Sequence, residues 1–410
     1  MDNREFDVIV WGATGFTGRL VVEYLVNTYG VDGELRWAVA GRSREKLDEV
    51  LHAYLAQGQR DRLPLVLADS ADATSLKAMA ERTRVICTTV GPYAKYGTAL
   101  VAACAAAGTD YCDLTGEVQW MARVIPQYQQ MAVDSGARIV HTCGFDSVPF
   151  DMGVWHLQQL MQAEHGVYAT EVKGRVGSSR GGASGGTIAS IFNMMEEARQ
   201  DPSIREQVAN PYVLYPPGMA PGSDGADQTG AVFDEDFQQW TSPFIMAAIN
   251  TRVVRRSNAL LGLPWGADFR YDEAILNKSR TQALLLSAAS GAGMLALALG
   301  PTRKLAQRVL PKPGEGPSRE VRESGGYEIF FHGAHPHDRS KDMRIRVTGD
   351  MDPGYGSTSK MLAEAALCLA RDPALTAGGF WTPASALGQH YLDRLQANAG
   401  ITFTPVRGAD

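Results

Sequence analysis

The sequence lacks the features of a metal protein, a disulfide-stabilised protein or a nucleic-acid binder. Its five cysteines are an odd number and contain no CxxC pair, so neither a zinc site nor a disulfide framework is indicated. We predict buried free thiols and no metal. Lys and Arg number 39 against 45 Asp and Glu, and the net charge of −6 gives no general basic surface for nucleic acid.

A signal peptide and a clear membrane span are also missing. The polar start MDNREF leads directly into an apolar run, so we expect a cytoplasmic protein. The long uncharged run 283–300 is diluted by serine and glycine, whereas a spanning helix needs about 20 strongly apolar residues. Two alternatives stay open for it: a buried or dimer-interface helix, or a peripheral contact with the inner face of the plasma membrane. The cations that flank this run are Lys278, Arg280, Arg303, Lys304 and Arg308.

What is present indicates a globular protein of several domains. The chain has 410 residues, of which 45% are apolar and 20% charged. At about 150 residues per domain, this length suggests two or three domains. No internal repeat is evident.

The first 150 residues alternate short apolar runs with stretches of helical spacing. Such alternation forms right-handed βαβ units and a parallel sheet covered on both faces. We therefore predict an α/β fold with a doubly wound Rossmann domain over residues 1–150. The predicted strands are Phe6–Trp11, Leu35–Ala40, Leu65–Ala68, Val85–Val90, Tyr111–Leu114 and Ile139–Cys143, and the predicted helices lie near 17–29, 44–57, 73–81, 96–107 and 119–135.

The pattern changes after Asp151, which predicts a second, α+β domain with a mixed sheet over residues 151–351. Residues 200–240 are rich in Pro, Gly and Asp and predict long surface loops. Residues 352–410 return to helical spacing, and we expect them to pack back on the first domain. The strands predicted here are Glu171–Val176, Phe269–Leu276, Tyr327–His332 and Met343–Thr348, and the helices lie near 151–164, 187–199, 355–371 and 383–398.

A glycine-rich loop follows the first predicted strand. FDVIVW runs into GATGFTG, where the glycines allow a tight turn, close approach of backbone N–H groups to a pyrophosphate, and packing of the next helix. Its place at the start of a βαβ series indicates a dinucleotide site rather than a plain turn. The loop residues assigned to the cofactor are Gly12, Thr14, Gly15, Phe16, Thr17 and Gly18.

The end of the second strand bears on the choice of cofactor. An acid there would hold the ribose hydroxyls of NAD, but this chain has Arg42 followed by Ser43 and Arg44. A guanidinium suits a ribose 2′-phosphate, so NADP(H) is favoured. The alternative is that Ser43 only caps the next helix and the arginines are solvated. Asp69, after the third strand, could accept from the adenine amino group or be a turn residue.

Several longer segments carry a family resemblance. In order, they are GATGFTG, AGRSREKL, TTVGPYAKYGTALVAACAAAGTDYCDLTGE, CGFDSVPFDMG, SGGTIAS, PFIMAAINTRVVRRSNALLG, WGADFRYDEAIL and GEGPSREVRE. Together they resemble the saccharopine dehydrogenase-like oxidoreductases, and most closely their trans-acting enoyl reductase branch from mycobacteria and related bacteria. The resemblance implies NADP(H), a Rossmann domain joined to an α/β second domain, and reduction of double bonds in acyl chains of lipid-forming polyketide synthases.

Candidate chemical groups follow the fourth to sixth strands. Gly91 and Pro92 would lie beside the cofactor, and Tyr93 or Tyr96 could donate a proton or simply pack. Asp146 begins the predicted crossing into the second domain, so its carboxyl could act in catalysis or the residue could serve as a hinge. Further polar candidates at this edge are Asp113, Thr115, Glu117, Ser147 and Asp151.

Two other segments could meet substrate or partner. The stretch from Arg180 to Gly186 could close over a phosphopantetheine or pyrophosphate, or be a simple turn. The basic residues Arg252, Arg255 and Arg256 could meet an acidic carrier protein or form a solvated helix face.

The sequence thus predicts an NADPH-dependent enoyl reductase. Its acyl substrate would be carried on a polyketide synthase or carrier protein, and we expect a homodimer that binds no nucleic acid. The alternatives are a reductase of an amino-acid or imine substrate, and a lipid-associated nucleotide-binding protein without turnover.

Overall fold

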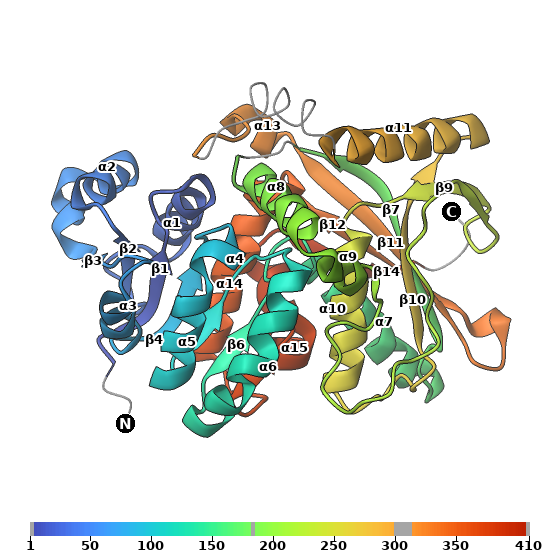
Figure 1. Ribbon diagram of the computed structural model, residues 1–410, viewed down its shortest axis with the longest axis horizontal. Helices are drawn as coiled ribbons and strands as arrows, with labels where there is room; N and C mark the ends of the chain where they lie inside the picture. The colour runs from blue at the N-terminus through green and yellow to red at the C-terminus, as the bar shows by residue number, and fades with distance from the viewer. Residues whose placement is uncertain (1–3, 182–184, 299–313, 407–410) are drawn as a thin grey trace.

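Two seven-stranded sheets organise the protein (Figure 1). The computed structural model describes residues 4–181, 185–298 and 314–406. The first sheet is entirely parallel and has the order β13-β6-β5-β4-β1-β2-β3. Its strands are β1 (Phe6–Trp11), β2 (Trp37–Gly41), β3 (Leu65–Leu67), β4 (Thr83–Thr88), β5 (Asp110–Cys112), β6 (Arg138–Val140) and β13 (Gly379–Trp381).

Both faces of the parallel sheet are buried, which confirms the predicted doubly wound fold. Along β1, Val8 and Val10 enter one hydrophobic core, while Ile9 and Trp11 enter the other. This alternation follows from the two-residue period of a strand between two helical layers. The helices that connect the strands are α1 (Phe16–Tyr29), α2 (Arg44–Tyr54), α3 (Ala73–Ala80), α4 (Tyr93–Tyr96), α5 (Thr98–Ala107) and α6 (Val118–Ser135).

The second sheet is mixed, with the order β14-β12-β11-β7-β10-β9-β8. Only β7 and β10 pair in parallel. One face packs on helices α7 (Val148–His165) and α10 (Ala247–Leu260). The strands are β7 (Glu171–Arg180), β8 (Val232–Asp234), β9 (Gln239–Pro243), β10 (Arg270–Asn277), β11 (Gly326–Ala334), β12 (Met343–Gly349) and β14 (Ile401–Pro405).

The remaining α-helices follow β7 in the chain. They are α8 (Gly185–Gln200), α9 (Pro202–Ala209), α11 (Arg280–Ala298), α13 (Arg319–Glu323), α14 (Thr358–Arg371) and α15 (Pro383–Asn398); a single π-helical turn, Pro353–Ser357, precedes α14.

The C-terminal segment contributes to both sheets. Helix α14 packs against α1, and β13 adds a strand to the parallel sheet beside β6. The last strand, β14, instead pairs with β12 in the second sheet. The described residues from 352 to 406 therefore complete both sheets.

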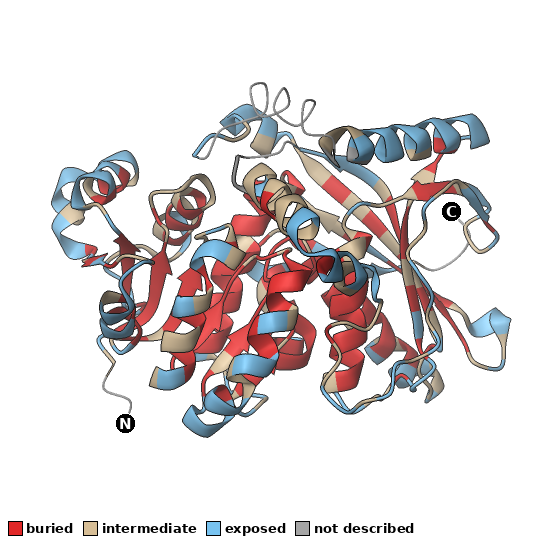
Figure 2. Ribbon diagram, in the orientation of Figure 1, coloured by how far each residue is buried: buried red, intermediate tan, exposed pale blue. Residues whose placement is uncertain are grey.

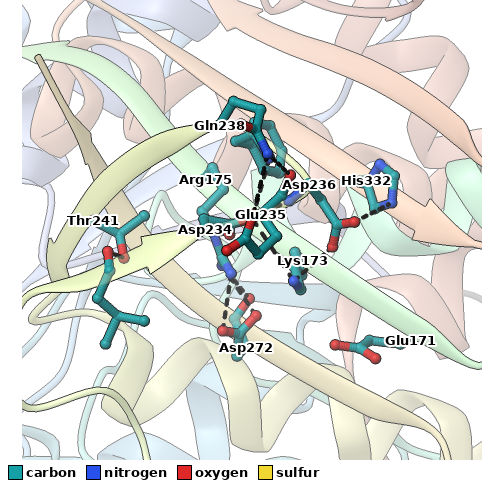
Figure 3. Close-up of polar contacts among 12 residues, drawn as sticks. Glu171, Lys173, Arg175, Asp234, Glu235, Asp236, Gln238, Thr241, Asp272 and His332 are labelled. Atoms are coloured by element: carbon teal, nitrogen blue, oxygen red, sulfur yellow. Dashed lines mark hydrogen bonds and ion pairs between the residues drawn. The ribbon is translucent and has the colours of Figure 1, made fainter.

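The other face of the second sheet carries a network of ion pairs (Figure 3). Lys173 Nζ lies 2.6 Å from Asp236 Oδ2, and Arg175 Nε lies 2.6 Å from Asp234 Oδ2. The turn between β8 and β9 is thereby held against β7. Asp236, His332 and Asp342 lie close enough together to resemble a metal site. Their ligand atoms already face Lys173, Arg339 and Arg344, however, so we interpret the cluster as part of the ion-pair network.

Two sequence predictions about residues 200–260 were wrong. Residues 200–240 contain α9, β8 and the start of β9 rather than loops alone. The basic residues of α10 neither form a solvated face nor meet a carrier protein, because Arg252, Arg255 and Arg256 are all less than 5% exposed. Aspartates of the preceding loop neutralise the first two: Arg252 pairs with Asp227, and Arg255 Nε lies 2.8 Å from Asp224 Oδ2.

The structure also shows the state of the cysteines and the exposure of the uncharged run. All five cysteines are free and buried, as predicted. Helix α11, which covers most of the uncharged run, is not a core helix of the chain, because most of its length is exposed (Figure 2). Within the described part of the chain, no helix combines the length and the apolar character needed to cross a bilayer.

Candidate cofactor and active site

The predicted cofactor residues lie at one edge of the parallel sheet. Gly12, Arg42 and Asp69 follow β1, β2 and β3, while Gly91 and Asp146 follow β4 and β6. The order in which strands are added to the sheet reverses between β1 and β4: β2 and β3 lie on one side of β1, and β4, β5 and β6 lie on the other. Ligands of doubly wound folds bind at the carboxyl ends of the strands beside such a reversal.

The glycine loop has the geometry of a dinucleotide cradle. Gly12 has φ +90°, and a Cβ at this position would lie 2.6 Å from a methyl carbon of Val90. A Cβ at Gly18 would lie only 2.1 Å from the carbonyl oxygen of Gly12, so the helix can approach the loop only with glycine there. No side chain caps α1 and its first turn contains no acid. Its N-terminal N–H groups therefore suit the pyrophosphate of NADP(H).

A distant part of the chain covers this loop. A Cβ at Gly316 would lie 2.4 Å from the ring of Phe16, and the Arg322 guanidinium carbon is 5.7 Å from that ring's centroid. The Tyr355 ring meets the Phe16 ring edge-on, with centroids 5.2 Å apart. Sequence reasoning missed Gly316, Arg322 and Tyr355, because they lie about 300 residues beyond the loop and no spacing links them to it.

The end of β2 presents a cation without a partner. Arg42 is exposed and forms no ion pair with any residue in the described ranges. Ser43 Oγ accepts a hydrogen bond from the Lys46 amide and caps α2. The cap that the alternative interpretation predicts is therefore present, and the Arg42 guanidinium beside it remains available to a 2′-phosphate. Asp69 Oδ1 accepts from the Ala71 amide, which favours the turn interpretation for Asp69.

The two candidate tyrosines occupy different environments. Tyr93 is 3% exposed; its hydroxyl donates to the Thr88 carbonyl and accepts from the Leu114 amide, and its ring stacks on Trp120. Burial raises the pKa of the Tyr93 hydroxyl well above its usual value. Of the two interpretations of Tyr93, proton donor or packing residue, this placement favours packing. Tyr96, at the end of α4, is 45% exposed.

Buried carboxylates shape the loops around this edge. Glu117 accepts from the Tyr93 and Ala94 amides and from Ser190 Oγ of α8, at 2.8 to 2.9 Å. Glu117 therefore fixes the start of α4 and links α8 to the carboxyl edge of the parallel sheet. Asp113 accepts from the Tyr111 hydroxyl and from the amides of Thr115 and Thr142, which joins the loops after β5 and β6. Both are positioning carboxylates.

Asp146 differs from these carboxylates because it has no hydrogen-bond partner among the described residues. It is half-buried after β6, and its Oδ2 lies 3.5 Å from the position that a Cβ of Gly116 would take. Burial raises the pKa of Asp146 to about 6. A carboxyl that is part protonated near neutral pH can donate a proton.

Ser147 and Asp151 connect this edge to the second half of the chain. Ser147 Oγ donates to Asn250 Oδ1, and Asn250 Nδ2 donates to Glu273. Asp151 accepts from Ser257 Oγ and from the Ala384 amide at the start of α15. Burial raises the pKa of Asp151 to about 7. These contacts give both residues a structural role at the domain crossing.

Helix α8, which follows the Rossmann domain in sequence, lies beside this edge of the parallel sheet. Thr187 Oγ1 lies 2.7 Å from the Tyr355 hydroxyl, and Ser190 Oγ lies 3.8 Å from the position of a Cβ on Gly91. Residues 182–184 of the predicted RGGASGG turn lie outside the described residues. Gly91 therefore lies beside α8, while Pro92, Tyr96 and Asp146 follow strands at the same edge of the sheet.

Comparisons with known proteins agree with this geometry. Residues 8–140 match the saccharopine dehydrogenase NADP binding domain. A protein of Mycobacterium tuberculosis (strain H37Rv), named as a trans-acting enoyl reductase, is 43% identical over 98% of both chains. A trans-acting enoyl reductase of Mycobacterium ulcerans is 38% identical, again over 98% of both. In fold, the chain is similar to saccharopine dehydrogenase (L-Glu forming) from Saccharomyces cerevisiae, with a TM-score of 0.53, 11% identity, and coverage of 98% of this chain and 99% of that one.

The glycine cradle, the unpaired Arg42 and the uncapped start of α1 fit NADP(H), and the matched NADP-binding domain has the same extent as the parallel sheet up to β6. Full-length similarity at this level of identity settles the family. This chain belongs to the saccharopine dehydrogenase-like oxidoreductases, in the trans-acting enoyl reductase branch, and is an NADP-dependent oxidoreductase.

Proposed function

We propose that the protein reduces an α,β double bond in an acyl chain that a lipid-forming polyketide synthase or a carrier protein presents as a thioester. Full-length similarity to relatives named trans-acting enoyl reductase carries the proposal. An unpartnered, protonatable carboxyl, Asp146, at the cofactor edge supports it, because enoyl reduction needs one proton as well as one hydride.

Bound NADPH would supply the hydride for the β carbon of the enoyl group. The backbone of the glycine loop would hold its pyrophosphate, and Arg42 its 2′-phosphate. Gly91 leaves room for close approach of the cofactor, since the atoms nearest to the position of a Cβ there, in the Tyr93 ring and at Ser190 Oγ, lie 3.5 to 3.8 Å away. Asp146 would pass its proton to the α carbon and become a carboxylate, which solvent then reprotonates. Helix α8 would exclude water from the reacting carbons.

Tyr96 is the alternative proton donor. Its hydroxyl is exposed on α4 and has no hydrogen-bond partner among the described residues. Exposure on the surface leaves the Tyr96 hydroxyl open to water, whereas burial raises the pKa of Asp146 to about 6, within reach of neutral pH. We therefore assign the proton to Asp146.

Turnover by the purified full-length chain tests this function. An α,β-unsaturated acyl pantetheine thioester and NADPH should give loss of reduced nicotinamide absorbance and a product heavier by two hydrogens. The saturated thioester serves as the control. Reduction of an imine or amino-acid precursor, with none of the enoyl thioester, would establish the amino-acid alternative. NADPH binding without turnover of either substrate class would establish a nucleotide-binding role.

A further inference from the structure

Helix α11 is an apolar helix that the rest of the chain leaves largely uncovered. Its exposed leucines are Leu284 (50%), Leu285 (66%), Leu286 (40%) and Leu295 (64%). It contacts β9 and β10, and Ala283 is buried at its start. Figure 2 shows the helix along one side of the molecule, exposed over most of its length. Single exposed leucines are common, but four on one helix form a surface that calls for a partner.

The sequence of α11 explains why exposure of this helix to water alone is unfavourable. Residues 281–298 contain no charged side chain, and their polar groups are few. One of these, Ser287 Oγ, donates to the Ala283 carbonyl within the helix. A surface helix of a soluble protein normally carries a charged face, whereas a helix apolar on all sides is normally covered.

Charge around α11 indicates what covers it. Between Glu273 and Glu315 the sequence has no acid, although the whole chain has a net charge of −6. Lys278 and Arg280 precede the apolar part, and both are exposed. The remaining cations of the segment are Arg303, Lys304, Arg308 and Lys312. An apolar surface with exposed cations at its start matches an anionic lipid surface, to which each cation adds attraction.

The N-terminal end of α11 adds an aromatic group of the kind found at lipid interfaces. The Arg280 guanidinium lies 5.3 Å from the Trp240 ring centroid, and the Trp240 ring meets the ring of Phe233, which is 36% exposed. Tryptophan and arginine both favour the head-group region of a bilayer. Because α11 lies along β9 and β10, it can meet such a surface flat, over a length of about 28 Å.

A second copy of this chain fits the surface less well. Pairing two such helices about a twofold axis would bring no opposite charge from the partner's α11 to Lys278 and Arg280, because residues 280–298 contain no acid. A bilayer with anionic head groups supplies that opposite charge.

We propose that α11 is a membrane-surface helix that docks the protein on an anionic bilayer through Leu284, Leu285, Leu286 and Leu295. Helix α13, whose Arg322 covers the cofactor loop, lies along the same side of the molecule (Figure 1). Docking would therefore place the cofactor edge near the lipid surface, where a long acyl chain can enter directly. The docking proposal stands without the proposed reductase activity.

Flotation with lipid vesicles tests the docking proposal on the full chain. The unmutated protein should float with vesicles of equal phosphatidylcholine and phosphatidylglycerol at low salt, and far less with pure phosphatidylcholine or at high salt. Leu285→Asp/Leu295→Asp should lower the partition coefficient roughly 100-fold, since two buried leucines are lost and two negative charges meet anionic lipid.

A matched variant controls for the added charge. Leu67 and Leu375 are 48% and 53% exposed away from α11, so Leu67→Asp/Leu375→Asp makes the same chemical change elsewhere and should still float. Failure of the folded, unmutated protein to float with anionic vesicles overturns the proposal, as does equal flotation of the α11 variant and the control. A dimer in solution that the α11 variant alone dissociates would show that a second copy covers the helix, and would also overturn it.

Discussion

Replacing Asp146 by asparagine tests the assigned proton source. Asp146 is half-buried and has no described partner to stabilise its charge, so burial raises its pKa to about 6 from the ordinary 3.8. The neutral acid is then the minor form at physiological pH: about one carboxyl in ten is protonated at pH 7 and about one in a hundred at pH 8.

The pH dependence of turnover follows from this population. If the protonated carboxyl is the active form, the turnover number should be flat below pH 6 and fall about tenfold for each pH unit above it. Asp146→Asn should lower turnover by about 10² to 10⁴, typical of a lost general acid, and should remove the break near pH 6. NADPH affinity should stay the same, because Asp146 follows β6, which β5 and β4 separate from β1 and its glycine loop.

Tyr96→Phe is the matched comparison, since it removes the other candidate proton. It should keep most of the turnover and the same pH profile. The assay is single-turnover oxidation of NADPH by an enoyl thioester, with the protein's unfolding midpoint measured alongside. Full activity and an unchanged profile in Asp146→Asn would refute the assignment, and a large loss in Tyr96→Phe would transfer it to Tyr96.

Three further predictions concern the cofactor cradle and the buried polar groups. Arg42→Ala should weaken NADPH binding about 10- to 100-fold and leave NADH binding unchanged, whereas equal affinity of the unmutated protein for both cofactors would contradict the role of Arg42. Gly18→Ala should abolish NADPH binding in calorimetry, because the added Cβ would lie 2.1 Å from the Gly12 carbonyl oxygen, while Gly291→Ala, with open space around it, should bind normally. Burial raises the pKa of Glu273 to about 8 from 4.5, so the folded state holds a proton that the unfolded chain releases, and the free energy of unfolding should fall as pH rises from about 4.5 to 8. Glu273→Gln should remove up to ~5 kcal/mol of that decline, and equal pH slopes for parent and variant in denaturant titrations would exclude it.

The Rossmann half was predictable because its determinants are local. Its signals lie within short windows of sequence: the strand FDVIVW, the glycines that follow it, and apolar runs that alternate with stretches of helical spacing. Each window therefore shows the hydrophobic period of its own strand or helix. Small boundary errors remained: the sixth strand ends at Val140 rather than Cys143, and Thr142 after it has φ 63°.

The errors occurred where the partner of a residue is distant in sequence. Three arginines in ten residues of α10 suggested a solvated face, because nothing in that window shows that Asp224 and Asp227 fold over it. The sequence does not distinguish Tyr93 from Tyr96, and only the structure shows that the Tyr93 ring is buried against Trp120 of α6. The same limit applies to Phe16, whose neighbours Gly316 and Arg322 come from the far end of the chain.

The C-terminal segment supplies one strand to each sheet, so both sheets stay incomplete until late in synthesis. During synthesis from the N-terminus, β6 is an open edge of the parallel sheet until residues 379–381 emerge and pair with it as β13. The edge of β12 likewise stays open until β14 at residues 401–405 is complete. Exposed strand edges can pair with other chains, so the nascent protein carries an aggregation-prone edge at β6 until β13 has emerged, and another at β12 until β14 has emerged. A truncation before Gly379 would make both edges permanent.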